Sequence, residues 1–130
     1  MKEIISYKDV DCEKYKIIIG AFNSFYNQNL LIEALSIISN GTGYGDDYTR
    51  FTFWNDLDPY DKTFYSEKFE GVEVEYIYDT IVIDYESFYK YTKTAMVNFL
   101  EKFPKEKDHV EEILKNMKKN FGISNKMDNN

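Results

Sequence analysis

Apolar side chains recur every three or four positions in two segments near the start of the chain. The first stripe contains Tyr15, Ile18, Ile19, Phe22, Phe25 and Tyr26, and the second contains Leu30, Ala34, Leu35 and Ile38. This spacing places apolar side chains on one face of a helix. Asn29 is the expected N-cap of the second helix, and Asn40-Gly41 is its expected end. The pattern predicts an antiparallel helical hairpin.

Between residues 48 and 83, β-branched and aromatic residues accumulate, and apolar positions recur at every second residue. In YTRFTFW (48–54), Phe51 and Phe53 share one face, and Thr52 and Trp54 share the other. Further on, the two faces carry Val72, Val74, Tyr76 and Tyr78 against Glu73, Glu75 and Ile77. We expect a turn at Asp79-Thr80 and a last strand at 81–83. The pattern predicts a three-stranded antiparallel meander whose wet face carries Glu73 and Glu75.

Two further helices are expected after the sheet. Asp84 is an acceptable cap for the first, which Pro104 should end, and Gly122 should end the second. Their buried stripes are Tyr85, Phe88, Ala95, Phe99 and Phe103, then Val110, Ile113, Leu114, Met117 and Phe121. The fold class is therefore α+β: an N-terminal helical hairpin, a three-stranded antiparallel β-meander and two C-terminal helices. We expect one domain over residues 1–122 and a disordered C-terminal tail over residues 123–130.

Composition limits the location of the protein. No apolar run is long enough to span a membrane, and the charged N-terminus does not resemble a secretory signal. Cys12 is the single cysteine, so no internal disulfide can form. We expect a cytoplasmic protein with no membrane partner. The sequence leaves the oligomeric state open.

The negative charge of the chain is concentrated in its middle third. Residues 46–86 contain twelve acids and three bases, a net charge of −9, whereas the rest of the chain carries +2. Aromatic residues are interleaved with these acids: Tyr44, Tyr48, Trp54, Tyr60, Phe64, Tyr65, Tyr76 and Tyr78. This argues against direct binding of nucleic acid and favours a face that binds a basic protein surface. The alternative is that the charge serves only solubility.

The glycines at 41, 43 and 45 do not predict a phosphate loop, because Asp46 follows where a glycine is needed and the segment comes after a helix. Asp56, Asp58 and Glu67 occupy positions one, three and twelve of an EF-hand register, but Asp61 replaces the glycine at position six. A small acidic metal-dependent hydrolase stays an alternative on this basis, beside a solvated acidic loop.

Catalysis finds little support elsewhere. His109 is the only histidine and lies in a charged run, and Cys12 has no evident base to activate it. We therefore expect no enzyme activity, no cofactor and no metal.

Residues 71–119 resemble the ribonuclease-toxin immunity proteins of bacterial contact-dependent growth inhibition systems. The matching stretches are FEGVEVEY, IVIDYESFYKY and FLEKFPKEKDHVEEILKNM. LSIISNGTGYGDD is more loosely similar to the same family. The resemblance implies an inhibitor that binds the nuclease domain of a cognate toxin and covers its active site or its RNA-binding surface. For the toxin-binding site we choose Asp46, Asp47, Glu73 and Glu75 as acids, with Tyr44 and Trp54 as aromatic anchors. A nucleic-acid mimic that inhibits another protein is a further alternative.

Overall fold

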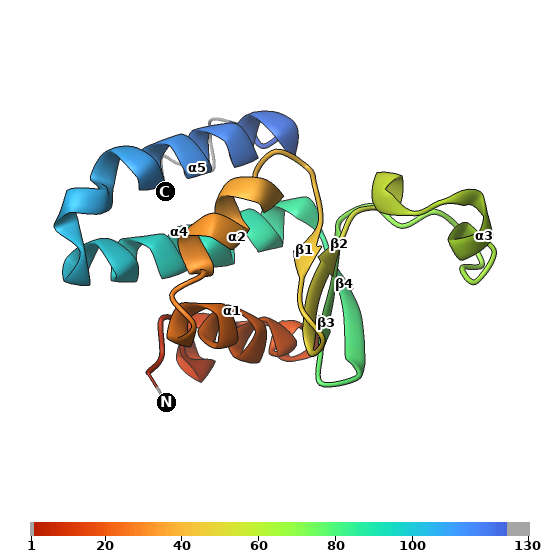
Figure 1. Cartoon of the computed structure of the whole chain (residues 1–130), viewed down its shortest axis with the longest axis horizontal. Coiled ribbons are helices and arrows are strands. Elements are labelled where there is room, and N and C mark those ends of the chain that lie inside the picture. Colours follow the sequence, from red (N-terminus) through yellow and green to blue (C-terminus); the bar gives the residue numbers. More distant parts are fainter. Residues whose placement is uncertain (1, 125–130) are drawn as a thin grey trace.

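The computed structural model describes residues 2–124 and contains an antiparallel sheet with helices packed against one face (Figure 1). The spatial strand order is β1-β2-β3-β4, which follows the sequence, so the sheet is a meander. Its strands are β1 (Tyr44–Gly45), β2 (Thr49–Thr52), β3 (Val72–Tyr76) and β4 (Asp79–Ile83). The main helices are α1 (Ile17–Asn27), α2 (Leu31–Ile38), α4 (Tyr85–Lys102) and α5 (Lys107–Asn120). The α+β class and the order of its parts are confirmed.

The sheet contains a fourth strand that the sequence pattern did not reveal. Tyr44 pairs with Phe51, and Gly45 pairs with Arg50, so β1 adds an edge to the predicted meander. Two residues are too short to show a period, and the glycines around them indicated a turn.

The predicted turn at Asp79-Thr80 is wrong. Tyr76 pairs with Asp79, so the two loop residues are Ile77 and Tyr78, with φ values of 46° and 72°. Positive φ at both positions is the geometry of a two-residue type I′ hairpin turn, for which Asn-Gly is the usual signal. Isoleucine and tyrosine give no such signal, so the turn could not be placed from the sequence.

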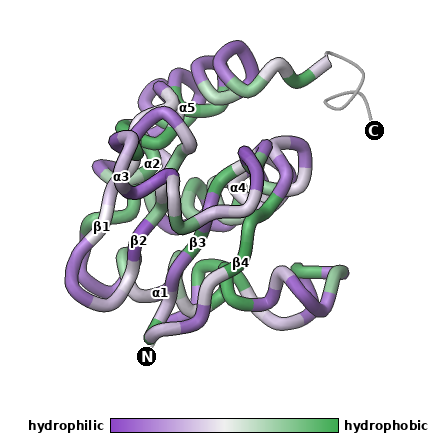
Figure 2. Tube along the Cα trace, turned by 90° about the vertical axis from the view of Figure 1, so that its right-hand side faces the viewer, coloured by the Kyte–Doolittle hydropathy of each residue, from purple (hydrophilic) through white to green (hydrophobic). Residues whose placement is uncertain are grey.

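The core lies between the sheet and helices α1 and α4. Phe22 of α1, Phe51 of β2 and Phe88 of α4 are at most 1% exposed, with ring centroids 5.7 to 6.0 Å apart. Val72 and Val74 of β3 are fully buried beside them, which confirms the predicted alternation. Figure 2 shows the hydrophobic stretch along β4 and the hydrophilic residues around α3.

Most predicted helix ends are confirmed. Asp84 Oδ2 accepts a hydrogen bond from the Ser87 amide at 3.0 Å, which caps α4. Phe103 follows α4, Pro104 begins the next turn, and Gly122 ends α5 with φ of 68°. None of the helices within residues 2–124 combines the length and apolar character needed to cross a bilayer.

Two details of the helices differ from expectation. Asn29 does not cap α2 with its side chain; it adopts φ of 62°, and Leu30 occupies the N-cap position without a side-chain hydrogen bond. Asparagine tolerates this left-handed geometry, which reverses the chain between α1 and α2. Phe103 is 45% exposed instead of buried, because it follows the last helical residue of α4. Its ring still packs on that of Phe99, with centroids 4.7 Å apart.

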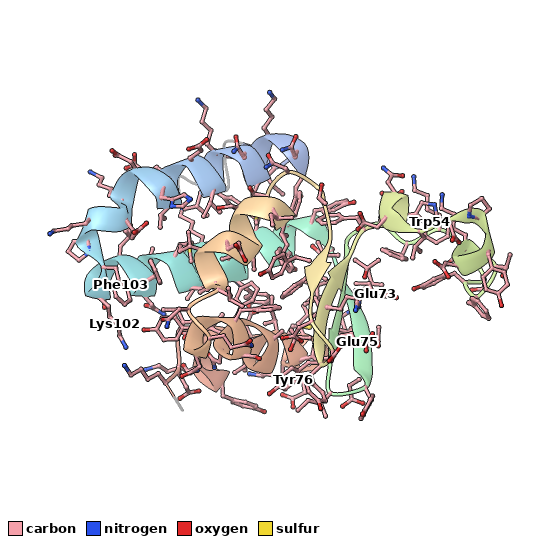
Figure 3. The ribbon with its side chains drawn as sticks, in the orientation of Figure 1. Trp54, Glu73, Glu75, Tyr76, Lys102 and Phe103 are labelled. Carbon is pink, nitrogen blue, oxygen red and sulfur yellow. The ribbon has the colours of Figure 1, made fainter. Side chains whose placement is uncertain are left out.

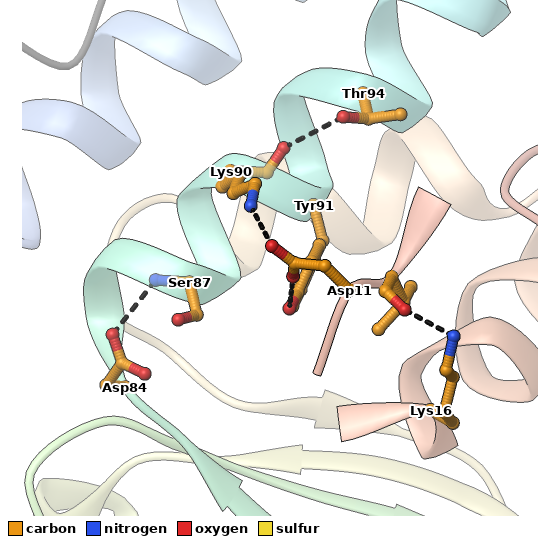
Figure 4. A network of polar contacts seen from close by, with 8 residues as sticks. Asp11, Lys16, Asp84, Ser87, Lys90, Tyr91 and Thr94 are labelled. Atoms are coloured by element: carbon orange, nitrogen blue, oxygen red, sulfur yellow. Dashed lines mark hydrogen bonds and ion pairs between the residues drawn. The ribbon is translucent and has the colours of Figure 1, made fainter. Parts of the chain in front are cut away.

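The N-terminal segment packs on the core, a role that its charged sequence did not indicate. Ile4 and Ile5 are 1% exposed, and their amides donate to the Asn23 side chain at 2.7 and 3.3 Å. The Asp11 carboxylate accepts from Lys90 Nζ at 2.6 Å and from the Tyr91 hydroxyl at 2.9 Å (Figure 4). These contacts join residues 2–16 to α1 and α4. The tail expected at 123–130 falls outside the described residues except for its first two, and Ile123 is buried.

Between β2 and β3 the chain makes an excursion over residues 53–71, which we call the arm. It contains one turn of 3-10 helix (Trp54–Asp56) and the short α3 (Pro59–Lys62). Figure 1 shows the arm extending from the sheet on the side away from the helices. Gly71 ends the arm with φ of 142°, and a Cβ there would lie 2.3 Å from the Ile83 carbonyl oxygen. Only glycine fits where the arm returns to the sheet.

Candidate functional site

The candidate site is the sheet face opposite the helices, which we call the outer face. According to the strand register and the alternation of side chains, the residues on the outer face are Arg50, Thr52, Glu73, Glu75, Thr80 and Val82. Figure 3 shows Glu73 and Glu75 on the side of the sheet that faces away from the helices. Tyr76 belongs to the opposite face, where its ring lies against Gly20 of α1.

Glu73 connects the outer face to the arm. The Tyr65 hydroxyl lies 2.8 and 2.9 Å from the two Glu73 carboxylate oxygens. Partial burial, with the neighbouring Glu73 carboxylate, raises the pKa of Tyr65 to about 12. The phenol is therefore a donor at neutral pH, and it fixes the orientation of the Glu73 carboxylate. No sequence pattern indicated this pair.

Glu75 is the less constrained acid of the outer face. Arg50 is its partner in the strand register, but Arg50 Nη2 lies 3.4 Å from the Asp46 carbonyl oxygen. No ion pair within 4.0 Å joins the Arg50 and Glu75 side chains. The Glu75 carboxylate is half-buried and open to a partner's cation.

Asp46 and Asp47 lie at the tip of the β1–β2 hairpin. Asp46 Oδ1 accepts from the amides of Tyr48 and Thr49, both at 2.9 Å. Partial burial alone would raise the pKa of Asp46. The amide hydrogen bonds lower it by more than burial raises it, so the pKa of Asp46 lies below its ordinary value. Asp46 is thus a fixed carboxylate that shapes the turn, whereas Asp47 is exposed.

The tips of the two hairpins meet and expose apolar side chains. The Ile77 amide donates to the Tyr48 carbonyl oxygen at 2.9 Å, which joins the β1–β2 turn to the β3–β4 turn. Tyr48, Ile77 and Tyr78 are 62%, 52% and 83% exposed. We call residues 46–48 and 77–79 the hairpin tips. The aromatic pattern included Tyr48 and Tyr78, but their exposure depends on turns that the sequence did not place.

The structure does not bring the two predicted aromatic anchors together. Tyr44 is the register partner of the buried Phe51, so it lies on the helix side of the sheet. Its hydroxyl donates to Glu33 Oε2 at 2.6 Å, and this bond, with partial burial, raises the pKa of Tyr44 to about 12. Trp54 lies at the base of the arm, with Tyr65 and Phe69 at 5.6 and 5.4 Å. Trp54 therefore supports the arm, and Tyr44 is separated from Glu73 and Glu75 by the sheet.

Few acids of the middle third form ion pairs with bases in the part of the chain that the structure describes. Among the ion pairs between described residues, Lys68–Glu70 at 3.8 Å is the one that involves any of the twelve. Several of these acids accept from backbone amides instead, including Asp56 from Phe53 and Asp58 from Asp61. Within residues 2–124, no three or more histidine, cysteine or acidic side chains are grouped closely enough to hold a metal ion. Asp56 and Asp58 of the EF-hand register are therefore turn-capping carboxylates.

His109 and Cys12 lie in separate parts of the molecule. His109 is on α5, where its ring nitrogens lie 3.3 Å from Ser36 Oγ and from Glu106 Oε2. Cys12 is partly buried against the core in the N-terminal segment. No hydrogen bond between them forms a nucleophile–base pair of the kind that thiol catalysis needs.

A comparison with protein families shows the family of this chain. Residues 13–114, 102 of the 130 residues, match the family model described as CDI immunity protein. The chain belongs to the CDI immunity protein family. The matched region includes all four strands, the arm and the outer face. A comparison with curated proteins found no match. CDI denotes contact-dependent growth inhibition, and an immunity protein of such a system neutralises a cognate toxin.

Proposed function

We propose that this CDI immunity protein neutralises a toxin nuclease, a ribonuclease, in the cytoplasm without catalysis or a cofactor. It does so by placing its outer face and hairpin tips on the cationic surface with which the toxin holds RNA. The observation that carries the proposal is the set of acids concentrated in residues 46–86, of which Glu70 alone forms an ion pair with a base among the described residues.

Charge complementarity supports this choice of partner. A ribonuclease holds a phosphate backbone with lysine and arginine side chains. A face that presents Glu73, Glu75 and Asp47 to such a surface gains attraction over long distances. Steering of this kind can raise association rate constants to ~10⁸–10⁹ M⁻¹s⁻¹ at low salt, which suits an inhibitor that must act before RNA is cleaved.

The acids have different roles in this proposal. Glu75 and Asp47 are free to pair with the toxin's cations. Glu73 is held in one orientation by Tyr65, and Asp46 is held by two backbone amides. Fixed carboxylates lose less conformational freedom on binding, so they favour tight association. The exposed apolar side chains of the hairpin tips supply contact area beside these charges.

A charge reversal at Glu75 tests the proposal. The binding partner is the C-terminal domain of the toxin encoded directly upstream of this gene, and association is followed by stopped flow at several salt concentrations. We expect Glu75→Lys to lower the association rate constant about tenfold at low salt and to reduce its dependence on salt. Glu75→Gln should have a smaller effect in the same direction.

The matched control is Glu101→Lys, which reverses an exposed acid on α4, away from the sheet. Its association should slow much less. Equal effects of the two reversals would show that only net charge matters and that the toxin docks elsewhere. Rescue of toxin-expressing cells by wild-type protein, and poorer rescue by Glu75→Lys, would extend the result to neutralisation.

A further inference from the structure

The far end of the arm displays a pair of large apolar side chains. Tyr60 and Phe64 are 69% and 71% exposed, and their rings meet edge to face with centroids 5.2 Å apart. A contiguous exposed aromatic pair costs solubility and adds nothing to the core. Aromatic side chains in such a position are typical of anchors that a partner protein buries.

The base of the arm is held by ring packing and a hydrogen bond, which fix the direction in which the arm leaves the sheet. At its base, the rings of Trp54, Tyr65 and Phe69 pack with centroids 5.4 to 5.6 Å apart. Tyr65 is bonded to Glu73 of the sheet, and the Asp58 side chain accepts from the Asp61 amide to cap α3 at 2.8 Å. A surface that is ordered before binding gives up little conformational entropy when a partner covers it.

The surroundings of the aromatic pair indicate the chemistry of its partner. Residues 53–71 carry five acids and two lysines. The exposed Asp58 caps α3, and the exposed Asp61 lies within it. An apolar pair among carboxylates is complementary to an apolar pocket whose rim carries lysine or arginine. The hairpin tips have the same combination, with Tyr48, Ile77 and Tyr78 beside Asp47 and Asp79.

We infer that the arm is a second anchor, in which Tyr60 and Phe64 insert into an apolar pocket with a basic rim on the toxin. The outer face meets the toxin's cationic surface at the same time, so one toxin domain contacts both the arm and the sheet. This inference rests on the proposed function and adds the determinant of residence time. Charge on the outer face governs the association rate, and the aromatic pair, once buried in the complex, governs the dissociation rate.

The test compares the full-length wild-type chain with the double variant Tyr60→Ser/Phe64→Ser. Dissociation from the C-terminal domain of the toxin encoded directly upstream is measured by biolayer interferometry at two salt concentrations. We expect the double variant to dissociate about 30-fold faster or more, with an association rate and salt dependence close to those of wild type. Because both side chains are mainly exposed, its thermal midpoint should stay within a few degrees of wild type.

Val97→Ser is the control, since Val97 is 53% exposed on α4 and its loss should leave dissociation unchanged. If wild type binds the toxin in a salt-dependent manner and the double variant dissociates at the wild-type rate, the arm inference is overturned while the proposed function stands. Absence of wild-type binding would overturn both. If the double variant instead abolishes self-association seen for wild type in sedimentation and leaves toxin binding intact, the aromatic pair joins two copies of this chain and the inference is wrong.

Discussion

The Tyr65 hydroxyl lies within 2.9 Å of both carboxylate oxygens of Glu73, and this contact joins the arm to β3. Glu73 is therefore two things at once: an acid of the outer face and the acceptor that positions the arm. A change at Glu73 would disturb both, which is why Glu75 is the cleaner site for testing charge.

Removing the Tyr65 hydroxyl should loosen the arm without removing any charge. We expect Tyr65→Phe to lower the free energy of unfolding by about 1 kcal/mol, because one partly buried hydrogen bond to a carboxylate is lost. Urea unfolding followed by circular dichroism measures this change. Tyr48→Phe removes a hydroxyl from an exposed ring and should cost much less. Equal stability of the two variants would show that the Tyr65–Glu73 contact does not hold the arm.

Asp84 should make a pH-dependent contribution to stability. Burial alone would raise the pKa of Asp84. Hydrogen bonds from the Ser87 amide and from the Tyr15 hydroxyl, which lies 2.9 Å from Asp84 Oδ1, lower it by more, so the pKa of folded Asp84 lies below its usual range. The contribution is then present above the unfolded pKa of about 3.9 and is lost as pH falls through the lower folded value. We expect Asp84→Ala to lower the free energy of unfolding by about 1–2 kcal/mol at pH 7, measured by urea titration.

The same titration repeated at lower pH provides the check on Asp84. The gap between wild type and Asp84→Ala should narrow as pH drops below about 4, because the wild-type carboxylate becomes protonated. Asp79→Ala, at an exposed acid of the turn, should show little gap at either pH. A gap for Asp84→Ala that persists unchanged at pH 2.5 would mean that the carboxylate charge contributes nothing.

Asp11 should stabilise the fold mainly through Tyr91. The Tyr91 ring is 1% exposed, and its hydroxyl donates to Asp11, so Asp11→Ala leaves a polar group inside the protein without this acceptor. We expect Tyr91→Phe to cost about 1 kcal/mol. Asp11→Ala should cost less in the Tyr91→Phe background than in wild type, as a double-mutant cycle from chemical denaturation measures. Lys90→Ala should have the smaller effect, because the Lys90–Asp11 ion pair is exposed. Additive effects of Asp11→Ala and Tyr91→Phe would contradict this account.

The β3–β4 turn should be stabilised by a sequence that suits it better. Ile77 and Tyr78 both adopt positive φ, which a β-branched or bulky residue does at a cost. We expect Ile77→Asn/Tyr78→Gly to raise the free energy of unfolding by about 1–2 kcal/mol in urea titrations. The same variant should bind the toxin domain more weakly, because both exposed side chains are lost. Higher stability with unchanged binding would show that the hairpin tips are not part of the toxin-binding surface.

The sequence predicted those features that a local pattern specifies. The alternation of Val72 and Val74 with Glu73 and Glu75 identified both faces of β3, and Asp84 and Pro104 located the ends of α4. The turn at Ile77-Tyr78 escaped prediction because its geometry is imposed by strand pairing and is not favoured by its residues. Tyr44 was misplaced relative to the outer face because a two-residue strand has no readable period.

The candidate site depended more on contacts between distant residues. Glu73 and Glu75 could be proposed from their alternation alone. Nothing in the spacing of Tyr65 and Glu73 indicates a hydrogen bond, since the arm must first fold on its aromatic cluster. The exposure of Tyr60 and Phe64 likewise follows from the direction of the arm, which helix and strand periods do not encode.

Thr52 and Glu73 are register partners, so the arm leaves and rejoins the sheet at neighbouring points of one strand pair. The entropy of closing such an insertion grows only slowly with its length. The part of the arm around α3 can therefore be lengthened or shortened without shifting the strands that support it, provided that the buried Phe53 and the returning Gly71 are kept.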